Sequence, residues 1–81
     1  MNIQPIHIID GIEIYSESQI LMGIPVGNTY TYDQETAFLN GWCMAMNAHY
    51  YSVPGDCFSL ANAAHSARRH GKSRVVVNSL S

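Results

Sequence analysis

The amino-acid sequence predicts an α+β fold in which a small, mainly antiparallel sheet packs on two helices. Two isoleucine-rich runs on either side of Asp10 and Gly11 predict an N-terminal β-hairpin. Apolar residues at helical spacing predict one helix over residues 34–51, and an alanine-rich run predicts a second over residues 57–70. Because 81 residues suffice for one hydrophobic core and no more, we expect a single α+β domain over residues 1–81.

The stretch IHIIDGIEIY carries the strongest strand signal in the chain. An Asp-Gly pair favours a two-residue type I′ turn, which places Ile9 opposite Ile12 and decides which side chains share a face. A second interpretation stays open, namely one continuous strand with a bulge at Gly11. The two interpretations turn different isoleucines toward the core.

The next two segments are less regular. SESQILMGIPVGN fits either a short strand around Ile20 or one helical turn, and Pro25 makes its second half a loop. The alternation TYTY at residues 29–32 predicts a strand, with Tyr30 and Tyr32 on one face.

The helix expected over residues 34–51 has capping residues at its N-terminus and a broad apolar face. Asp33 is expected to cap it, with Glu35 in the first turn, where the helix dipole favours an anion. Gly41 lies in its interior, where we expect another backbone to approach closely. The stripe expected to face the core consists of Phe38, Trp42, Ala45, Met46 and His49.

The second helix is punctuated at both ends. Pro54 and Gly55 should end the first helix, and Asp56 is expected to cap the second. Gly71 stands where a left-handed C-cap residue belongs, and SRVVVNS after it predicts a closing strand. The sheet should therefore consist of the N-terminal hairpin, the Tyr/Thr strand and the C-terminal strand.

Composition bears on partners and location. Apolar residues make up 47% of the chain and charged residues 12%, where about a quarter is usual. We therefore expect apolar surface that a partner covers, and a homodimer. No run approaches the ~20 apolar residues of a membrane span, and the first residues show no signal-peptide pattern. Two cysteines are too few for a disulfide scaffold, so we expect a cytoplasmic protein with no membrane contact.

All lysines and arginines lie near the end of the chain, whereas the six acids all precede residue 57. Three interpretations stay open. Cations in the last turn of a helix offset its dipole, worth about 0.3–1 kcal/mol each. The cluster could also contact an acidic protein surface, including that of a second copy, or the phosphates of a nucleic acid. The candidate binding residues are Arg68, Arg69, Lys72 and Arg74.

Cysteine and histidine spacings do not favour a metal site. No CxxC, HxxxH or HExxH pattern occurs, and we expect no metal and no cofactor. The stretch PGDCFSLANAAHSARRHGKSRVVV places Cys57 in the first turn of a helix, where the dipole lowers a thiol pKa. Over roughly 20 residues it resembles the nucleophile helix of transglutaminase-like and papain-like cysteine enzymes. The resemblance implies a nucleophilic Cys57 whose base would have to be His7 or His49.

Aromatic residues point to a partner surface. Five tyrosines and a tryptophan are many for a chain of this size, and these types are enriched in interface hot spots. The tyrosines expected in a partner surface are Tyr30, Tyr32, Tyr50 and Tyr51.

The sequence therefore predicts a small, non-enzymatic protein-binding module that regulates or inhibits a larger protein. Many products of phages and mobile elements are of this kind. The first alternative is a nucleic-acid accessory protein that uses the basic cluster at residues 68–74. The second is a cysteine-dependent enzyme that uses Cys57.

Overall fold

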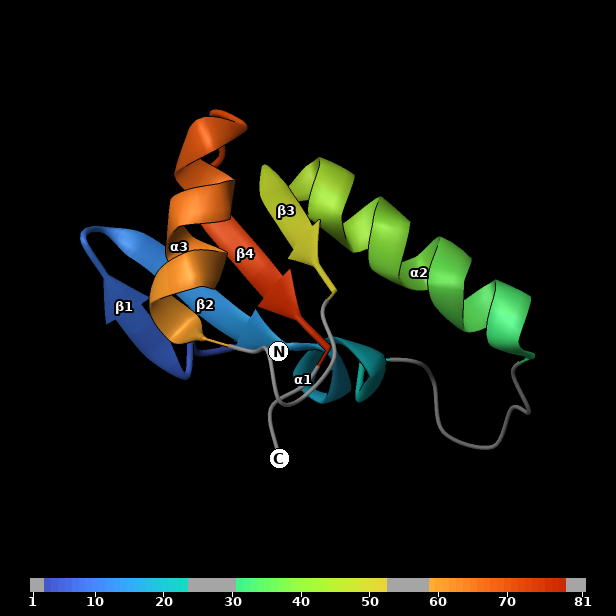
Figure 1. The fold of residues 1–81 in the computed structure, drawn as a ribbon. Coiled ribbons are helices and arrows are strands. Elements are labelled where there is room, and N and C mark those ends of the chain that lie inside the picture. The colour runs from blue at the N-terminus through green and yellow to red at the C-terminus, as the bar shows by residue number, and fades with distance from the viewer. Residues whose placement is uncertain (1–2, 24–30, 53–58, 79–81) are drawn as a thin grey trace.

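A computed structural model describes residues 3–23, 31–52 and 59–78 and holds one four-stranded sheet with helices on both of its faces (Figure 1). The strands lie in the order β1-β2-β4-β3. The elements in chain order are β1 (His7–Ile9), β2 (Ile12–Ser16), α1 (Glu17–Leu21), α2 (Tyr32–Ala45), β3 (Ala48–Tyr51), α3 (Leu60–Arg69) and β4 (Arg74–Val77).

The α+β class is confirmed, but the sheet is mixed rather than mainly antiparallel. Only β1 and β2 pair in antiparallel fashion, whereas β4 runs parallel to both of its neighbours, β2 and β3. Parallel neighbours need a crossover connection, and α3 supplies it between β3 and β4. The prediction of mainly antiparallel pairing was wrong, because the residue pattern of a strand does not show which strand it pairs with or in which direction.

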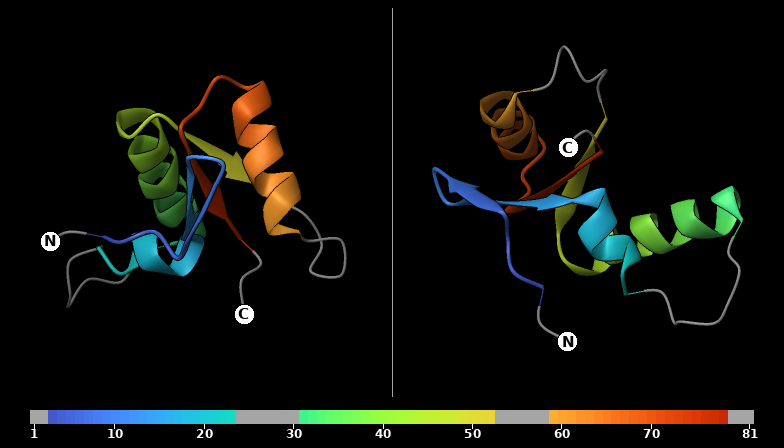
Figure 2. Two further views of the ribbon diagram at one scale, coloured as in Figure 1. Left: turned by 90° about the vertical axis from the view of Figure 1, so that its left-hand side faces the viewer. Right: turned by 90° about the horizontal axis from the view of Figure 1, so that it is seen from below.

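The connections explain why helices cover both faces. From β2 the chain crosses over β4 to reach β3, and from β3 it turns back to β4. Right-handed crossovers in opposite directions place their helices on opposite faces of a sheet. Figure 2 shows α1 and α2 on one face and α3 on the other.

The central strand β4 contributes to the core on both faces. Val75 and Val77 pack on the α3 side, Val76 packs on the α2 side, and all three are fully buried. The buried residues of α3 are all small, which lets the helix come close: Ala63, Ala64 and Ala67. Leu60 packs beside them. On the other face the buried residues of α2 are Leu39 and Cys43, with Phe38 and Trp42 partly buried beside them.

The N-terminal hairpin is confirmed in detail. Ile9 pairs with Ile12, and the two turn residues have the positive φ angles of a type I′ turn, 51° at Asp10 and 81° at Gly11. The alternative of one continuous, bulged strand is therefore wrong.

The segment left open between strand and helical turn is the helix α1. Its N-cap Ser16 and Gln19 form a capping box. The following strand prediction over residues 29–32 is wrong where the structure describes it, because Thr31 is the N-cap of α2 and Tyr32 its first residue. Tyr30 lies outside the described residues.

The helix predicted over residues 34–51 begins earlier and ends earlier. Thr31, not Asp33, is its N-cap, and Gln34 completes a capping box. The helix ends at Ala45, and Asn47 takes a left-handed φ of 55°. Asparagine tolerates that conformation, which turns the chain into β3. No helix among the described residues is long and apolar enough to span a membrane.

Residues 48–51 form a strand because the local sequence AHYY suits one. Aromatic residues favour the pleated, half-buried surface of a sheet. The apolar stripe predicted to continue through Ala45 to His49 is therefore wrong, because Ala45 is exposed and His49 lies in β3.

The predicted end of the second helix is confirmed, but the predicted start at residue 57 is wrong, because the side chain of Ser59 caps the helix and α3 begins at Leu60. Gly71 has a φ of 71°. Its N–H donates to the carbonyl of Arg68 at 3.0 Å, and the N–H of Lys72 donates to the carbonyl of Ala67 at 2.9 Å. These two bonds are those of a Schellman motif. Asp56, the expected cap, lies outside the described residues.

Two glycines with different backbones give a matched test of this fold. Gly71→Ala should lower the free energy of unfolding by about 1 kcal/mol, because alanine is strained at positive φ. Gly41→Ala should raise it by about 0.5–1 kcal/mol, because Gly41 is inside α2 and a Cβ there meets nothing within 4 Å. The expected close backbone at Gly41 is thus absent from the described residues. Urea denaturation measures both changes, and a stabilising Gly71→Ala would contradict the assigned C-cap.

Candidate functional site

The strand β3 lies at one end of the sheet and pairs, among the described strands, with β4 alone. The direction of its backbone groups follows from the ladder. The N–H of Glu13 donates to the carbonyl of Ser73 at 3.2 Å, so Ser73 and, two residues on, Val75 turn their backbone groups toward β2. Backbone direction alternates along a strand, so Arg74 and Val76 turn theirs toward β3.

The register then decides which residues of β3 meet them. Ala48 is the partner of Arg74, and Tyr50 is the partner of Val76. In a parallel ladder the bonds run to the residues on either side of the partner, here His49 and Tyr51. The N–H and carbonyl groups of Ala48 and Tyr50 therefore point away from the sheet, and no described residue forms a backbone bond with them.

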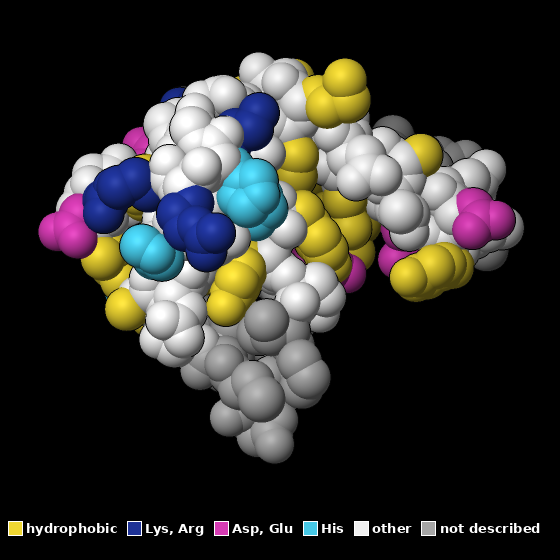
Figure 3. Space-filling view, turned by 45° about the horizontal axis from the view of Figure 1, so that its top comes forward, with side chains coloured by type: hydrophobic (Ala, Val, Ile, Leu, Met, Phe, Trp, Pro, Cys, Tyr) yellow, Lys and Arg dark blue, Asp and Glu magenta, His cyan; other side chains and the backbone are white. Residues whose placement is uncertain are grey.

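A groove runs along this edge. The helix α2 extends past β3 on one side of the sheet, and α3 stands on the other (Figure 2). Figure 3 shows a hollow between α3 and α2 with hydrophobic side chains within it and acidic side chains at its margin. We call this hollow the β3 groove; its two sides are the α2 side and the α3 side.

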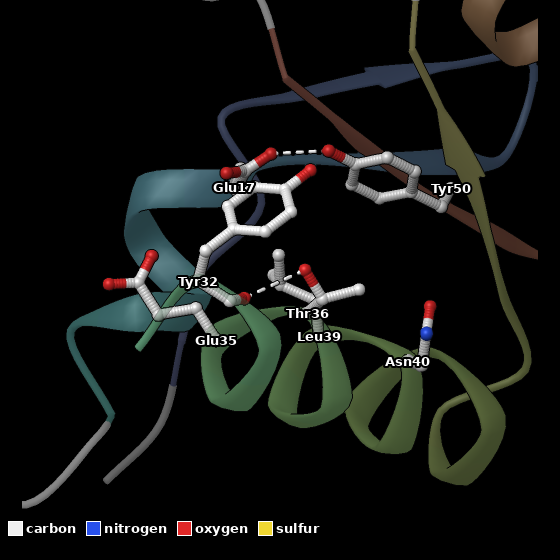
Figure 4. Close-up of a pocket in the computed structure, with 7 residues that line it drawn as sticks. All are labelled: Glu17, Tyr32, Glu35, Thr36, Leu39, Asn40 and Tyr50. Carbon is white, nitrogen blue, oxygen red and sulfur yellow. Dashed lines mark hydrogen bonds between the residues drawn. The ribbon is translucent and has the colours of Figure 1, made fainter. Parts of the chain in front are cut away.

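A pocket of about 100 Å³ lies on the α2 side. Its volume is roughly that of three water molecules in the liquid, well below the ~300 Å³ at which small-molecule sites begin. The pocket is therefore sized for the head of one side chain. Its lining residues, drawn in Figure 4, are Glu17, Tyr32, Glu35, Thr36, Leu39, Asn40 and Tyr50.

Two tyrosines and a carboxylate define the upper part of this pocket. The hydroxyl of Tyr50 donates to Oε2 of Glu17, so the end of β3 is tied to the start of α1. Burial and this carboxylate raise the pKa of Tyr50, so the phenol stays protonated and remains a donor. The ring of Tyr32, 82% exposed, stands beside this pair with its hydroxyl turned toward it (Figure 4).

The two carboxylates of the pocket have no cationic partner among the described residues. All four lysines and arginines of the chain lie within residues 68–74. The ion pairs of the described residues are Arg68 with Asp10 and Arg74 with Glu13. Glu17 and Glu35 therefore give the α2 side of the groove an uncompensated negative charge.

The α3 side has the opposite character. Nε2 of His49 and Oγ of Ser66 are 3.0 Å apart, and the ring of His49 stacks on that of His70 with centroids 4.2 Å apart. Burial lowers the pKa of His49, and the nearby His70 and Lys72 lower it further, so its imidazole is neutral at pH 7. No described carboxylate pairs with His49, so this serine and histidine lack the third group that orients a catalytic base.

The predicted basic residues divide into two kinds. Arg68 donates to the carbonyl of Asp10 at 2.9 Å, and Arg74 donates to Oε1 of Glu13 and to the carbonyl of Met46, both at 2.8 Å. These two arginines hold the hairpin turn and the centre of the sheet. Their neighbours Arg69 and Lys72 make no ion pair with a described carboxylate and remain predicted binding residues.

The fold separates Tyr51 from Tyr32 and Tyr50. Tyr32 is exposed at the start of α2, whereas Tyr50 and Tyr51 lie on opposite faces of β3. Tyr51 packs partly against the α3 side of the core. The structure brings together Tyr32 and Tyr50 but adds two residues that sequence reasoning did not select, Glu17 and Glu35. Both are ordinary first-turn acids in the sequence, and nothing in their spacing marks a shared pocket.

A wider hollow of about 430 Å³ lies near the N-terminal residues, beside Tyr15, Trp42 and Arg74. Its polar groups are bonded to one another, since the hydroxyl of Tyr15 and Nε of Arg74 both donate to Oε1 of Glu13. The ring of Trp42 meets Tyr15 edge-on, with centroids 5.2 Å apart. This hollow therefore offers no free charge for recognition.

The described part of the chain contains neither a reactive thiol nor a cluster of metal ligands. Burial raises the pKa of the Cys43 thiol and keeps it protonated, and Cys57 lies outside the described residues. Among the residues that the structure describes, no three His, Cys, Asp or Glu side chains gather as metal ligands.

Comparison with known proteins adds no relative. No protein-family model, no curated protein and no solved structure matches this chain.

Amide exchange tests the assigned direction of the β3 backbone. The N–H groups of Ala48 and Tyr50 point away from the sheet, so they should exchange with solvent faster than those of His49 and Tyr51, which bond to β4. Native-state hydrogen exchange by NMR measures all four. Equal protection along β3 would show that this edge is already covered.

His49 should make the stability of the fold depend on pH. The pKa of His49 is lower in the folded protein than in the unfolded chain, so the unfolded chain binds the proton more tightly. The contribution of neutral His49 to the free energy of unfolding is therefore complete above the unfolded pKa, near 6.5. That effect is lost as the pH falls from about 7 toward 5. Thermal melts should show a smaller loss for His49→Gln than for the wild type, while His65→Gln, an exposed site on α3, should keep the full loss. An identical loss in all three proteins would contradict this.

Proposed function

We propose that this chain is a non-enzymatic protein-binding module, which takes an extended segment of a larger protein onto the β3 edge and thereby regulates or inhibits that protein. The observation that carries the proposal is the outward direction of the backbone groups of Ala48 and Tyr50, beside a groove. An added strand would satisfy these groups with main-chain hydrogen bonds, while side-chain pockets would provide specificity.

The edge strand β3 is short, at four residues, but it lacks other features by which proteins discourage strand addition. Native edge strands carry lysine, proline or a bulge, or are covered. The sequence of β3, AHYY, has no proline and no charged residue, and its pairing with β4 is regular. A β3 edge of this kind is therefore suited to receive a strand.

The other end of the sheet is a poorer candidate. The strand β1 has three residues and follows Pro5, and its Ile8 is 63% exposed. It belongs to a hairpin that projects from the sheet (Figure 1). Of the two edge strands in the described residues, β3 is the one with helices on both faces and a side-chain pocket beside it.

The same edge accounts for the homodimer expected from composition. Two copies would pair their β3 strands about a two-fold axis, and the partner segment would then compete with the second copy. Light scattering at several concentrations reads out this dimer directly. The buried, unpaired thiol of Cys43 fits action in the cytoplasm, the compartment expected from the sequence.

The two alternatives draw less support from the fold. A nucleic-acid site at residues 68–74 would rest chiefly on Arg69 and Lys72, because Arg68 and Arg74 are engaged internally. So few phosphate contacts would bind weakly and fade with salt. A cysteine enzyme would need a base oriented toward Cys57, and His49 is bonded to Ser66 instead.

Two substitutions at one position separate backbone from side chain. A random heptapeptide display library should yield peptides that bind the wild type. Tyr50→Ala keeps the outward N–H and should bind them more weakly, whereas Tyr50→Pro removes the N–H and should abolish binding. Proline is tolerated there because this N–H does not face β4. Circular dichroism should show that both variants fold.

Undiminished binding by Tyr50→Pro would contradict strand addition at β3. A library that yields no binder to the wild type would contradict the proposed function as a whole.

A further inference from the structure

We propose that the pocket lined by Glu17, Tyr32, Glu35 and Tyr50 is a specificity site for one lysine or arginine side chain of the strand bound at β3. The inference rests on the proposed function, because the cationic side chain is taken to belong to the added strand. It names the feature by which that strand would be selected.

The first argument is charge. Two carboxylates line a pocket of about 100 Å³, and none of the four lysines and arginines of the chain pairs with either. Glu17 is held in place by the hydroxyl of Tyr50 through Oε2, which leaves Oε1 without a bond to any described residue. Glu35 lies within the first turn of α2, at the end of the pocket away from Tyr50 (Figure 4). A cation that enters between them would be the missing counter-charge.

The second argument is the aromatic lining. Tyr32 is 82% exposed, so a ligand can reach its ring. An ammonium or guanidinium group is attracted to the face of a tyrosine ring, by about 0.5–1 kcal/mol at exposed sites. Leu39 lies at the floor of the pocket and offers apolar contact to the aliphatic stem of the same side chain. Carboxylate, ring face and apolar floor together match a lysine or arginine side chain.

The third argument is position. A strand added to β3 would lie about 4.8 Å from it, and its side chains would point alternately to the α2 side and the α3 side. Tyr50 presents its outward backbone to that strand and its side chain to the pocket. A side chain of the added strand that points to the α2 side next to Tyr50 therefore lies over the pocket. The next residue points to the α3 side, where His49, His70 and Lys72 lie.

The pocket is not built for a bare metal ion or for a metabolite. The described residues contain no group of three side chains that could hold a metal ion. Its volume is about a third of the lower limit for small-molecule sites. The head of one side chain, attached to a backbone that binds elsewhere, is the occupant that its size fits.

Peptide selection with matched variants tests this. The heptapeptide library is selected against the wild type, Glu35→Gln and Asp33→Asn. The Asp33→Asn variant is the control, because this substitution removes one negative charge from the same turn of α2 at a residue that does not line the pocket. Wild-type binders should share lysine or arginine at one fixed position. Glu35→Gln should lose that preference, and should bind the best wild-type peptide about five-fold more weakly; Asp33→Asn should keep both.

The outcomes separate the inference from the function on which it rests. Binders without a fixed basic position, or a preference that survives Glu35→Gln, would overturn the cation site and leave strand addition intact. An equal loss in Asp33→Asn would show general attraction to the acidic helix and would also overturn it. Replacing the basic residue of the best peptide by norleucine should remove the difference between wild type and Glu35→Gln.

Discussion

The insertion of β4 between β2 and β3 is the pairing on which the rest of this structure depends. Its three valines are fully buried and contribute to the core on both faces. Without β4 the hairpin and β3 do not meet, because β2 and β3 each pair with β4 and not with one another. The same insertion puts β3 at the end of the sheet with its outward backbone beside α2. The candidate site is thus a consequence of how the core is completed.

The charges of the chain are divided by this fold rather than mixed. Part of the basic cluster serves the architecture, since Arg74 bridges Glu13 and the carbonyl of Met46 and thereby joins β2, β4 and the end of α2. Arg68 reaches the hairpin turn at Asp10. Because Arg68 and Arg74 form these internal bonds, they do not pair with the carboxylates of α1 and α2. The one-sided charge of the sequence therefore persists as a one-sided charge across the groove, acidic on the α2 side and basic on the α3 side.

Local chemistry decided how much of the fold could be predicted. The hairpin and the C-cap at Gly71 were predictable because each depends on a short local motif that contains a glycine at positive φ. The end of the first long helix was not, because apolar residues continue past Ala45 and a single left-handed residue, Asn47, redirects the chain. Likewise Thr31 suits both a strand and an N-cap, and Gln34 three residues later favours the cap. Parallel pairing and the pocket join residues 33 positions apart, such as Glu17 and Tyr50, which no short pattern encodes.

A domain this small has little interior in which to build a ligand cavity, which favours the edge of the sheet for the recognition surface that we propose. On the α3 face of the sheet, buried alanines bring the helix close to the strands. On the α2 face the helix extends past β3, so part of α2 lies beyond the last strand of the sheet (Figure 2). The uncovered remainder of α2 presents side chains that are largely exposed in the described chain, Tyr32 among them. An extended segment fits this geometry better than a globular ligand, because it needs one row of hydrogen bonds and one pocket rather than a broad complementary surface.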